Sequence, residues 1–228
     1  MIPLRDLQPR RGAPIVTVLL IVANALVFFY ELSLGPGLDR YLLQAAFIPA
    51  RLTEGPVVLS FGFGIASALV SMFLHGGWLH LLGNMLYLWI FGDNVEDRLG
   101  HARFLLFYLL AGLAATFAQV IANPGSEVPM IGASGAISGV LGAYLFLHPK
   151  ARIRTLFFFF IFFTRIDVPA LVFLPVWFLM QFVSAYASLQ APAAQGGVAW
   201  FAHVGGFVAG PVLLMLLGRG RGRDYGAY

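Results

Sequence analysis

The sequence lacks cysteine altogether and is poor in charged residues. Without cysteine, neither disulfide bonds nor thiolate metal sites can form. Charged residues make up 11% of the 228 residues, whereas a soluble domain carries about a quarter. Hydrophobic residues make up 60%, so the composition excludes a soluble globular protein and indicates a polytopic membrane protein. At this length we expect one domain, because little chain remains for a sizeable soluble one.

Six apolar segments are predicted to cross the bilayer as helices, which makes the expected fold class all-α. They are residues 15–34, 78–91, 104–122, 133–148, 168–186 and 199–217. About 20 apolar residues span a bilayer, and the fourth segment is shorter, so at least one of its ends should lie below the membrane surface. The first segment continues beyond Ala25, where a cleaved signal peptide would end, and we therefore expect a retained helix.

The predicted parts of the chain are a cytoplasmic N-terminal tail at 1–13, a membrane domain at 14–218 and a cytoplasmic C-terminal tail at 219–228. Residues 35–66 form a long connection whose apolar end should lie partly in the membrane. The apolar stretch 155–163 is too short to span, and we interpret it as an interfacial segment. The small loop at 187–198 is a candidate lid over a site.

Positive charge is unevenly placed along this pattern and sets the expected orientation. If both tails and the connections 92–103 and 149–167 share one side, that side holds twelve of the 14 basic residues, and thirteen of the 14 are arginine. Basic residues gather on the cytoplasmic side, so both termini are expected there, in a multi-pass protein of a bacterial inner membrane. The charge is thus a topology signal and does not indicate nucleic-acid binding.

Ser134 lies between Gly132 and Gly135, where a polar loop turns into the fourth apolar segment. Glycine on both sides lets the backbone bend sharply and lets other groups approach the hydroxyl. Small residues also recur every fourth position from Ser134 through Ser138 to Gly142, which is the spacing that lets two membrane helices touch. Taken alone, the segment favours helix packing over catalysis, because short motifs often match by chance.

The orientation places four polar residues at a similar depth below the outer surface. The second, fourth and sixth segments all begin outside, and near their outer ends they carry His80, Asn84, Ser134 and His203. Polar groups inside a membrane are costly and usually face one another or a water-filled cavity. Gly206 and Gly210 follow at the four-residue spacing that would let the sixth segment approach the fourth closely. This coincidence is the main sequence evidence for a site.

The chemistry of these residues suggests roles. A neutral imidazole at His203 can take the hydroxyl proton of Ser134 and pass it to a leaving amine. No carboxylate is placed to orient that imidazole, so the unit is a dyad rather than a Ser-His-Asp triad. His80 and Asn84 point from one helix face. With the Ser134 N–H they can form an oxyanion hole, in which each donor is worth about 3–4 kcal/mol.

Together these residues resemble the rhomboid family of intramembrane serine proteases. The matching motifs lie within 73–210 and are His80-Leu81-Leu82-Gly83-Asn84, Gly132-Ala133-Ser134-Gly135, and Ala202-His203-Val204-Gly205-Gly206 leading to Gly210. The resemblance implies a six-helix rhomboid-like bundle in which Ser134 is the nucleophile and His203 the base. It implies that His80 and Asn84 are the oxyanion donors. Family members often carry an aromatic residue against the base, four positions after the serine, where this chain has Ser138.

The sequence therefore predicts a hydrolase, a serine-type endopeptidase that performs intramembrane proteolysis without a metal ion or other cofactor. The resemblance implies substrates that are membrane proteins, cut in or near a transmembrane segment. The expected partners are these substrates and the lipid bilayer, and not nucleic acid. A substrate helix is expected to reach the site between the second and fifth segments. The sequence leaves the oligomeric state, the physiological substrate and the group that orients His203 open.

Four alternatives stay open. Ser138 is a second candidate nucleophile, although it lies a turn deeper in the membrane. A metal site of His75, His80 and His203 would lack a nearby acidic partner and a His-Glu-x-x-His motif. A non-catalytic rhomboid-like protein that binds or escorts membrane proteins would share the architecture, although such proteins typically lack the serine or the histidine. A small transporter would be expected to show internal repeats or broken helices, and the sequence suggests neither.

Overall fold

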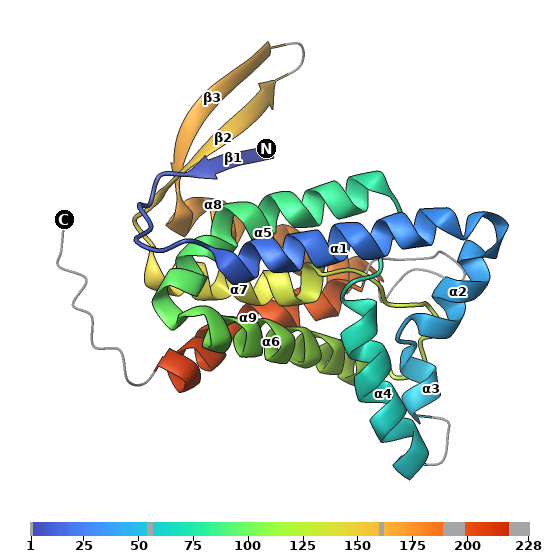
Figure 1. The fold of residues 1–228 in the computed structure, drawn as a ribbon. Helices are drawn as coiled ribbons and strands as arrows, with labels where there is room; N and C mark the ends of the chain where they lie inside the picture. The colour runs from blue at the N-terminus through green and yellow to red at the C-terminus, as the bar shows by residue number, and fades with distance from the viewer. Residues whose placement is uncertain (1, 54–56, 160–161, 189–198, 219–228) are drawn as a thin grey trace.

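The computed structural model is a bundle of helices with a small sheet at one end (Figure 1), and it describes residues 2–53, 57–159, 162–188 and 199–218. Six helices coincide with the six predicted apolar segments. They are α1 (Ile15–Ser33), α5 (Trp78–Leu99), α6 (His101–Ala122), α7 (Ser134–Leu147), α8 (Ala170–Ser188) and α9 (Trp200–Gly218). Most of the predicted lid loop and the whole predicted C-terminal tail fall outside the described residues.

The long connection after α1 is mostly helical. It folds into the 3-10 turn η1 (Gly35–Gly37), α2 (Leu38–Ala45), α3 (Pro49–Thr53) and the first part of α4 (Val57–Ser71). These elements lie at the end of the bundle away from the sheet (Figure 1). Helix α5 also runs beyond its predicted end at residue 91, because the polar residues after it continue the helix as far as Gly100. Gly100 has a φ of 79° and ends the helix.

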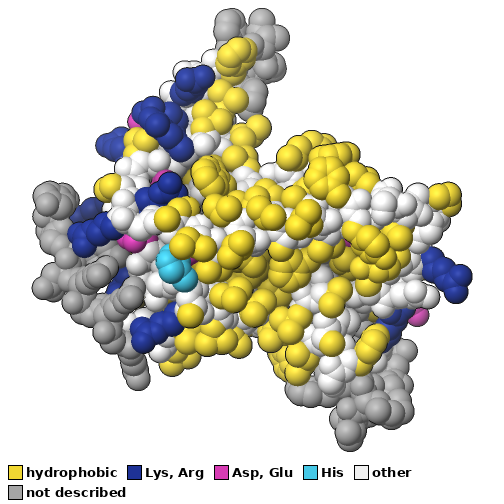
Figure 2. All heavy atoms as spheres, in the orientation of Figure 1, with side chains coloured by type: hydrophobic (Ala, Val, Ile, Leu, Met, Phe, Trp, Pro, Cys, Tyr) yellow, Lys and Arg dark blue, Asp and Glu magenta, His cyan; other side chains and the backbone are white. Residues whose placement is uncertain are grey.

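Three of the helices, α1, α6 and α9, are each long and apolar enough to cross a membrane. Helix α7 and the stretch Ala170–Ser184 of α8 are apolar but shorter. Hydrophobic side chains cover the middle of the bundle, while lysine and arginine gather mostly at the end that carries the sheet (Figure 2). The chain is therefore a mostly helical membrane protein.

Helix α7 forms the centre of the bundle. Residues 136–144 of this helix are all buried, and α5, α6, α8 and α9 pack around it. The ring of Tyr144 meets that of Phe91 of α5 edge to face, with 5.0 Å between the centroids. A helix that is apolar on every side is expected to lie inside a bundle, and α7 does so.

Helices α7 and α9 meet at backbone contact distance. A Cβ on Gly206 would overlap the carbonyl oxygen of Gly135, and a Cβ on Gly210 would overlap that of Gly139. Small residues at four-residue spacing allow membrane helices to approach in this way. The close approach predicted from Gly206 and Gly210 is therefore confirmed.

The all-α prediction is wrong in one respect, because the chain also forms a three-stranded antiparallel sheet. Its strands, in the order β1-β2-β3, are β1 (Ile2–Asp6), β2 (Arg152–Phe159) and β3 (Phe162–Pro169). The described residues of the predicted interfacial segment, 155–159 and 162–163, lie in β2 and β3. Ile153 lies between Arg152 and Arg154, and Thr155, Leu156 and a run of phenylalanines follow, which is a composition typical of strands. Strand β1 comes from the predicted N-terminal tail.

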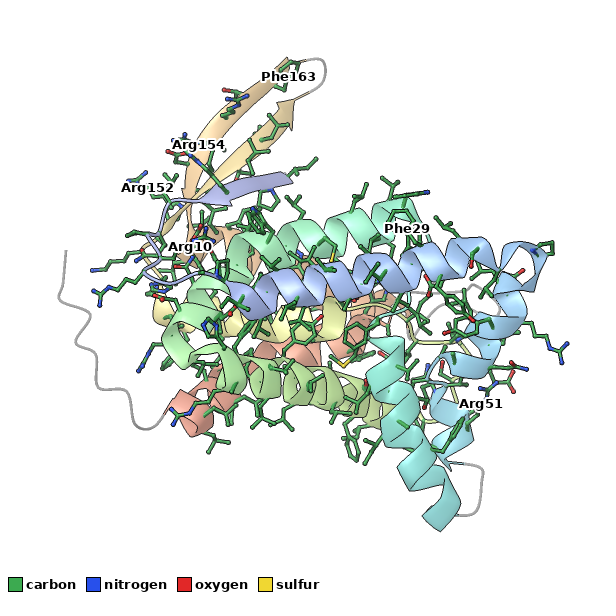
Figure 3. All side chains as sticks on the ribbon, viewed as in Figure 1. Arg10, Phe29, Arg51, Arg152, Arg154 and Phe163 are labelled. Carbon is green, nitrogen blue, oxygen red and sulfur yellow. The ribbon has the colours of Figure 1, made fainter. Side chains whose placement is uncertain are left out.

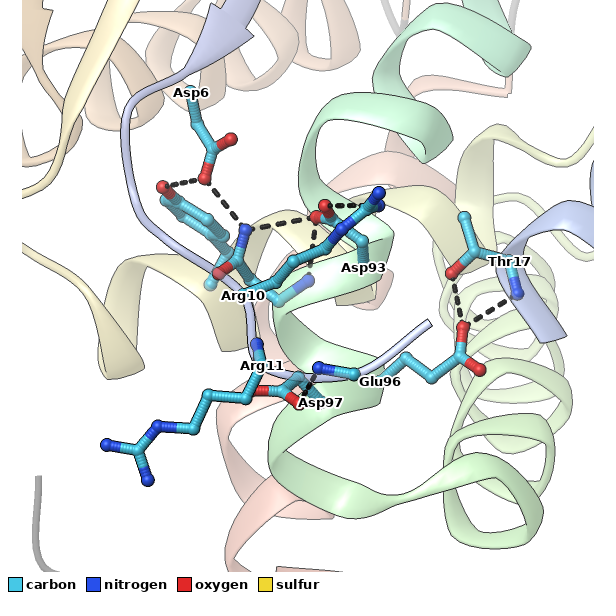
Figure 4. A network of polar contacts seen from close by, with 10 residues as sticks. Asp6, Arg10, Arg11, Thr17, Asp93, Glu96 and Asp97 are labelled. Atoms are coloured by element: carbon cyan, nitrogen blue, oxygen red, sulfur yellow. Dashed lines mark hydrogen bonds and ion pairs between the residues drawn. The ribbon is translucent and has the colours of Figure 1, made fainter. Parts of the chain in front are cut away.

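Glu96 of α5 caps the N-terminus of α1 (Figure 4). Its side chain accepts hydrogen bonds from the backbone N–H groups of Val16 and Thr17, both at 2.8 Å, and from Thr17 Oγ1 at 2.7 Å. His101 Nδ1 lies 2.6 Å from the same carboxylate. The first N–H groups of a helix lack partners within the helix, and negative charge is stabilising there. The buried carboxylate thus ties the start of α1 to the end of α5.

Asp6 at the end of β1 fastens the sheet to the helices (Figure 4). Its Oδ2 accepts hydrogen bonds from Tyr144 Oη at 2.9 Å and from Asn94 Nδ2 at 2.8 Å. Burial raises the pKa of the Asp6 carboxyl group from 3.8 to about 6, the hydrogen bond from Tyr144 opposes the rise, and the charge of Asp93 adds to it. The link between sheet and helices therefore contains a group that titrates.

Replacing Gly210 with alanine is expected to destabilise the bundle by about 1–3 kcal/mol, the range for overpacked cores. The added methyl group would have to displace the backbone of α7 at Gly139. Gly218→Ala is the matched control, because it lies on the same helix with nothing within 4 Å of the added Cβ. Thermal unfolding in detergent micelles measures both variants. Equal unfolding midpoints for the two would contradict this account of the packing.

Replacing Asp6 with asparagine is expected to make the stability of the contact between β1 and the helices independent of pH. A carboxyl group whose pKa is raised in the folded state contributes its full stability below 3.8 and loses that contribution as the pH rises through about 6. Protection of the β1 amides from hydrogen exchange, corrected for intrinsic rates, should therefore fall over this pH range in the unsubstituted protein and change little in Asp6→Asn. The β2–β3 amides are the internal control. Identical pH dependence in both proteins would show that Asp6 is not responsible.

Candidate active site

Ser134 is the first residue of α7, and the turn before it depends on Gly132. The φ of Gly132 is 114°, in the region that favours glycine. A Cβ at this position would also lie only 2.6 Å from His80 Nε2. Both the backbone conformation and the close approach of His80 therefore require glycine here. The turn brings the serine and the His80 imidazole to the same place.

A cavity of about 760 Å³ opens at the N-terminus of α7. Sites for ligands commonly measure about 300–1,000 Å³, so the cavity has room for a short extended peptide. Its walls come from the end of α4, from α5, α6, the start of α7 with the turn before it, α8 and α9. The polar and aromatic side chains that line it include His80, Asn84, Ser134, Trp177, Gln181 and His203. All four residues predicted for the site line this one cavity.

The imidazole of His203 on α9 reaches across to Ser134 on α7. Its Nε2 lies 2.7 Å from Ser134 Oγ, which is a hydrogen-bond distance. The His203 side chain is buried, and the contact spans the two helices that the glycines hold together. The pair has the geometry in which an imidazole can accept a proton from a hydroxyl group.

Gln181 of α8 occupies the other side of the imidazole. Its Oε1 lies 2.8 Å from His203 Nδ1. Because an amide oxygen only accepts hydrogen bonds, this contact places the hydrogen on Nδ1 and leaves Nε2 as the acceptor for the serine. The sequence analysis missed Gln181. The available signal was that Gln181 is the one side-chain amide in an otherwise apolar predicted span.

Two indole rings flank the imidazole of His203. The ring centroid of Trp177, one turn before Gln181, lies 6.3 Å from that of His203. The ring of Trp200 meets the imidazole edge to face at 5.8 Å. The orientation of the His203 ring, which the sequence left open, is therefore set by α8 and by the start of α9.

Ser138 is not placed to act as a nucleophile. Its side chain is fully buried, and its Oγ donates a hydrogen bond to the backbone carbonyl oxygen of Ser134 at 2.7 Å. This bond to the preceding turn is common for serine in helices. Ser138 is also not one of the described residues that line the cavity. The alternative that it carries the reaction thus loses its support.

His80 and Asn84 of α5 bring hydrogen-bond donors to the cavity. The Gly76 backbone N–H donates to His80 Nδ1 at 3.4 Å, so in the neutral ring Nε2 carries the hydrogen. Asn84 is buried, and its Nδ2 has no hydrogen-bond partner among the described residues. A buried donor without a partner is unfavourable. An anionic oxygen bound beside Ser134 would satisfy it.

The metal-site alternative gains no support from the described part of the chain. That part contains no group of three or more histidine, aspartate or glutamate side chains that could hold a metal ion. The imidazoles of His75 and His80 do meet edge to face, at 5.1 Å. The carboxylate of Glu31 lies near His75, and it accepts a hydrogen bond from the His75 backbone N–H at 3.2 Å.

These features define a helical membrane protein with a serine–histidine contact in a cavity that is lined by both polar and apolar side chains. Comparison with known families agrees with that class. The Rhomboid domain family matches residues 64–220, which is more than half of the chain and includes every residue of the candidate site. The chain belongs to the rhomboid family.

Three relatives illustrate the similarity. Rhomboid protease GluP of Bacillus subtilis is 35% identical over 150 residues, which cover 64% of this chain and 28% of GluP. The putative rhomboid protease YdcA of the same organism is 36% identical over 95 residues, 40% of this chain and 47% of YdcA. The bovine mitochondrial presenilin-associated rhomboid-like protein is 36% identical over 142 residues, 60% of this chain and 34% of that protein. The matched region spans less than half of each relative.

Proposed function

We propose that this protein is an intramembrane serine endopeptidase that cleaves transmembrane segments of membrane-protein substrates. The observation that carries the proposal is the 2.7 Å contact between Ser134 Oγ and His203 Nε2 inside the cavity. A hydroxyl group is a weak nucleophile unless an adjacent base removes its proton, and His203 is placed to do so. Membership of a family with members named as proteases supports the same reaction class.

The proposed reaction begins when His203 Nε2 takes the hydroxyl proton of Ser134 and Oγ attacks the scissile carbonyl carbon. The oxygen of that carbonyl becomes negative and accepts hydrogen bonds from the Ser134 N–H, His80 Nε2 and Asn84 Nδ2. Each such donor contributes about 3–4 kcal/mol to stabilising the transition state. The imidazolium then gives its proton to the leaving amine, and water, activated by the same base, hydrolyses the acyl-enzyme.

Gln181 acts in this mechanism as a positioning residue. By accepting the Nδ1 hydrogen it keeps the imidazole in the tautomer that presents a basic Nε2 to the serine. Aspartate does this in Ser-His-Asp triads and also stabilises the imidazolium by its charge. A neutral amide supplies the orientation without placing a carboxylate inside the membrane, where ionised groups are costly.

The proposed topology has six membrane spans, α1 and α5 to α9, in a bacterial inner membrane. Both termini lie on its cytoplasmic side. The gathering of basic residues at the sheet end of the bundle supports this orientation. The proposed path for a substrate helix lies between α5 and α8. Tyr87 and Trp177, one from each helix, line the cavity with ring centroids 6.3 Å apart. Separation of these two rings would open the cavity towards lipid.

Replacing Ser134 with alanine is expected to abolish cleavage of a reporter transmembrane segment by the purified protein, because no other hydroxyl touches His203 Nε2 among the described residues. Ser138→Ala is the matched control and should keep cleaving, since Ser138 only bonds to the backbone. Labelling with a fluorophosphonate measures the same nucleophile directly. Cleavage that survives Ser134→Ala would refute the assignment. If neither protein cleaves any reporter, non-catalytic binding of membrane proteins becomes the better account.

Replacing Gln181 with alanine is expected to lower kcat about tenfold to a hundredfold with little change in KM, because the wrong tautomer of His203 becomes populated. Gln181→Glu separates a positioning role from a structural one. A carboxylate at this position would stabilise the imidazolium and move the acid limb of the pH–rate profile to higher pH. An unchanged pH profile in Gln181→Glu, together with normal turnover in Gln181→Ala, would exclude the role.

A further inference from the structure

The three-stranded sheet projects sideways from one end of the bundle (Figure 1). Its base is anchored, since Ile153 and Thr155 of β2 are fully buried and Asp6 bonds to the helices. The remainder extends beyond them, with Phe163 near its far end (Figure 3). The proposed proteolytic mechanism assigns no role to this part of the chain.

One face of the sheet near its base is strongly basic. Strand pairing places on this face Arg5, Arg152, Arg154, Arg165 and Asp167. Arg154 Nε donates to Asp167 Oδ1 at 2.8 Å, so four positive charges and one negative charge leave a net charge of +3. Arg152 and Arg154 point away from the helices (Figure 3). This charge would suit a surface that carries phosphate groups.

The far part of the sheet exposes apolar side chains. Phe163 is 73% exposed and Ile2 is 43% exposed, and strand pairing places both on the same face as the arginines, whereas Ile166, 39% exposed, lies on the opposite face. In Figure 2 the hydrophobic side chains of the sheet lie along the side turned towards the helices, and the basic ones lie along the opposite side. The first turn of α8, which follows β3 directly, also exposes apolar side chains, since Leu171 and Val172 are both more than half exposed. Large exposed apolar surfaces of this kind mark contact with lipid or with another protein.

We propose that the sheet lies in the headgroup region of the cytoplasmic leaflet, with its far end among the acyl chains and its arginines on the phosphates of anionic lipids. Amphipathic elements bind membranes by burying apolar side chains and attracting anionic lipids, and long arginine side chains can reach headgroups from an apolar base. Lipid is favoured over a protein partner because α8, a proposed membrane span, follows the sheet directly and exposes apolar side chains from its first turn. The inference uses the proposed topology but not the proposed catalysis.

The lipid contact would act on the candidate site through α8. Helix α8 follows β3 directly at Ala170, whose N–H donates to Ala151 O at 2.7 Å. The next N–H, that of Leu171, donates to Pro149 O at 3.0 Å. The sheet and the start of α8 are thus one hydrogen-bonded unit. A sheet held on the membrane would fix the start of the helix that carries Gln181.

The absence of cysteine allows the position of the sheet to be measured with single labels. The full chain with Phe163→Cys, carrying a fluorophore, is reconstituted into vesicles that contain lipids with nitroxide-labelled acyl chains. Leu26→Cys on the exposed side of α1 is the lipid-facing control. Gly125→Cys, in an exposed loop with nothing within 4 Å of its Cβ, is the control in water.

We expect the Phe163 label to be quenched nearly as strongly as the Leu26 label and much more strongly than the Gly125 label. Quenching no stronger than at Gly125 would overturn the proposal and leave a water-facing surface for a protein partner. The readout does not depend on cleavage, so a failure here is distinct from a failure of the proposed protease function.

The arginines are tested by comparing vesicles of phosphatidylglycerol and phosphatidylcholine. Quenching at Phe163→Cys should be stronger in the anionic vesicles. In the Arg152→Gln/Arg165→Gln background, the preference for anionic lipid should fall by about fivefold for each arginine removed. Arg40→Gln on α2, at the other end of the bundle, is the matched control. Equal quenching in both lipids, or a preference unchanged by the double substitution, would refute the role of the arginines.

Discussion

The contact between the backbones of α7 and α9 is the constraint on which the rest of the structure depends. Ser134 and His203 belong to different helices, and their 2.7 Å hydrogen bond exists only because Gly206 and Gly210 let those helices touch. A hydrogen bond needs its heavy atoms within about 3.2 Å, and a methyl group at either glycine would overlap the backbone of α7 and force the two helices to shift. The packing of α7 against α9 therefore also positions the two side chains of the candidate site.

Two structural carboxylates, Glu96 and Asp6, lie away from that contact. Glu96 and Asp6 satisfy the start of α1 and the base of the sheet at one end, while the cavity further along the bundle orients its imidazole with the neutral Gln181. Ionised side chains are costly inside a membrane unless they are paired. These carboxylates thus lie at the sheet end of the bundle, and the site relies on hydrogen-bond geometry.

Those features of the fold that depend on the pattern of neighbouring residues could be predicted from the sequence. Apolar length revealed the six helices, and the small residues around Ser134 and after His203 predicted how two of them meet. Sequence reasoning missed what depends on distant partners. Strand β1 pairs with β2 across about 150 residues of chain, and nothing near Ile2 reveals that partner. Gln181 was missed because its meaning arises only when α8 is placed against α9.

The position of Gln181 on α8 gives the proposed protease an intrinsic order of events. Helix α8 borders the cavity and also holds the imidazole, through Gln181 and Trp177. A substrate that displaced α8 as it entered would break the hydrogen bond between His203 Nδ1 and Gln181 Oε1. The imidazole would then no longer be held in the orientation that presents Nε2 to Ser134. Reactivity would return only when the helix settles against the bound segment. The serine–histidine pair would thus be interrupted while a substrate enters, and a passing transmembrane helix that fails to seat would be left uncut.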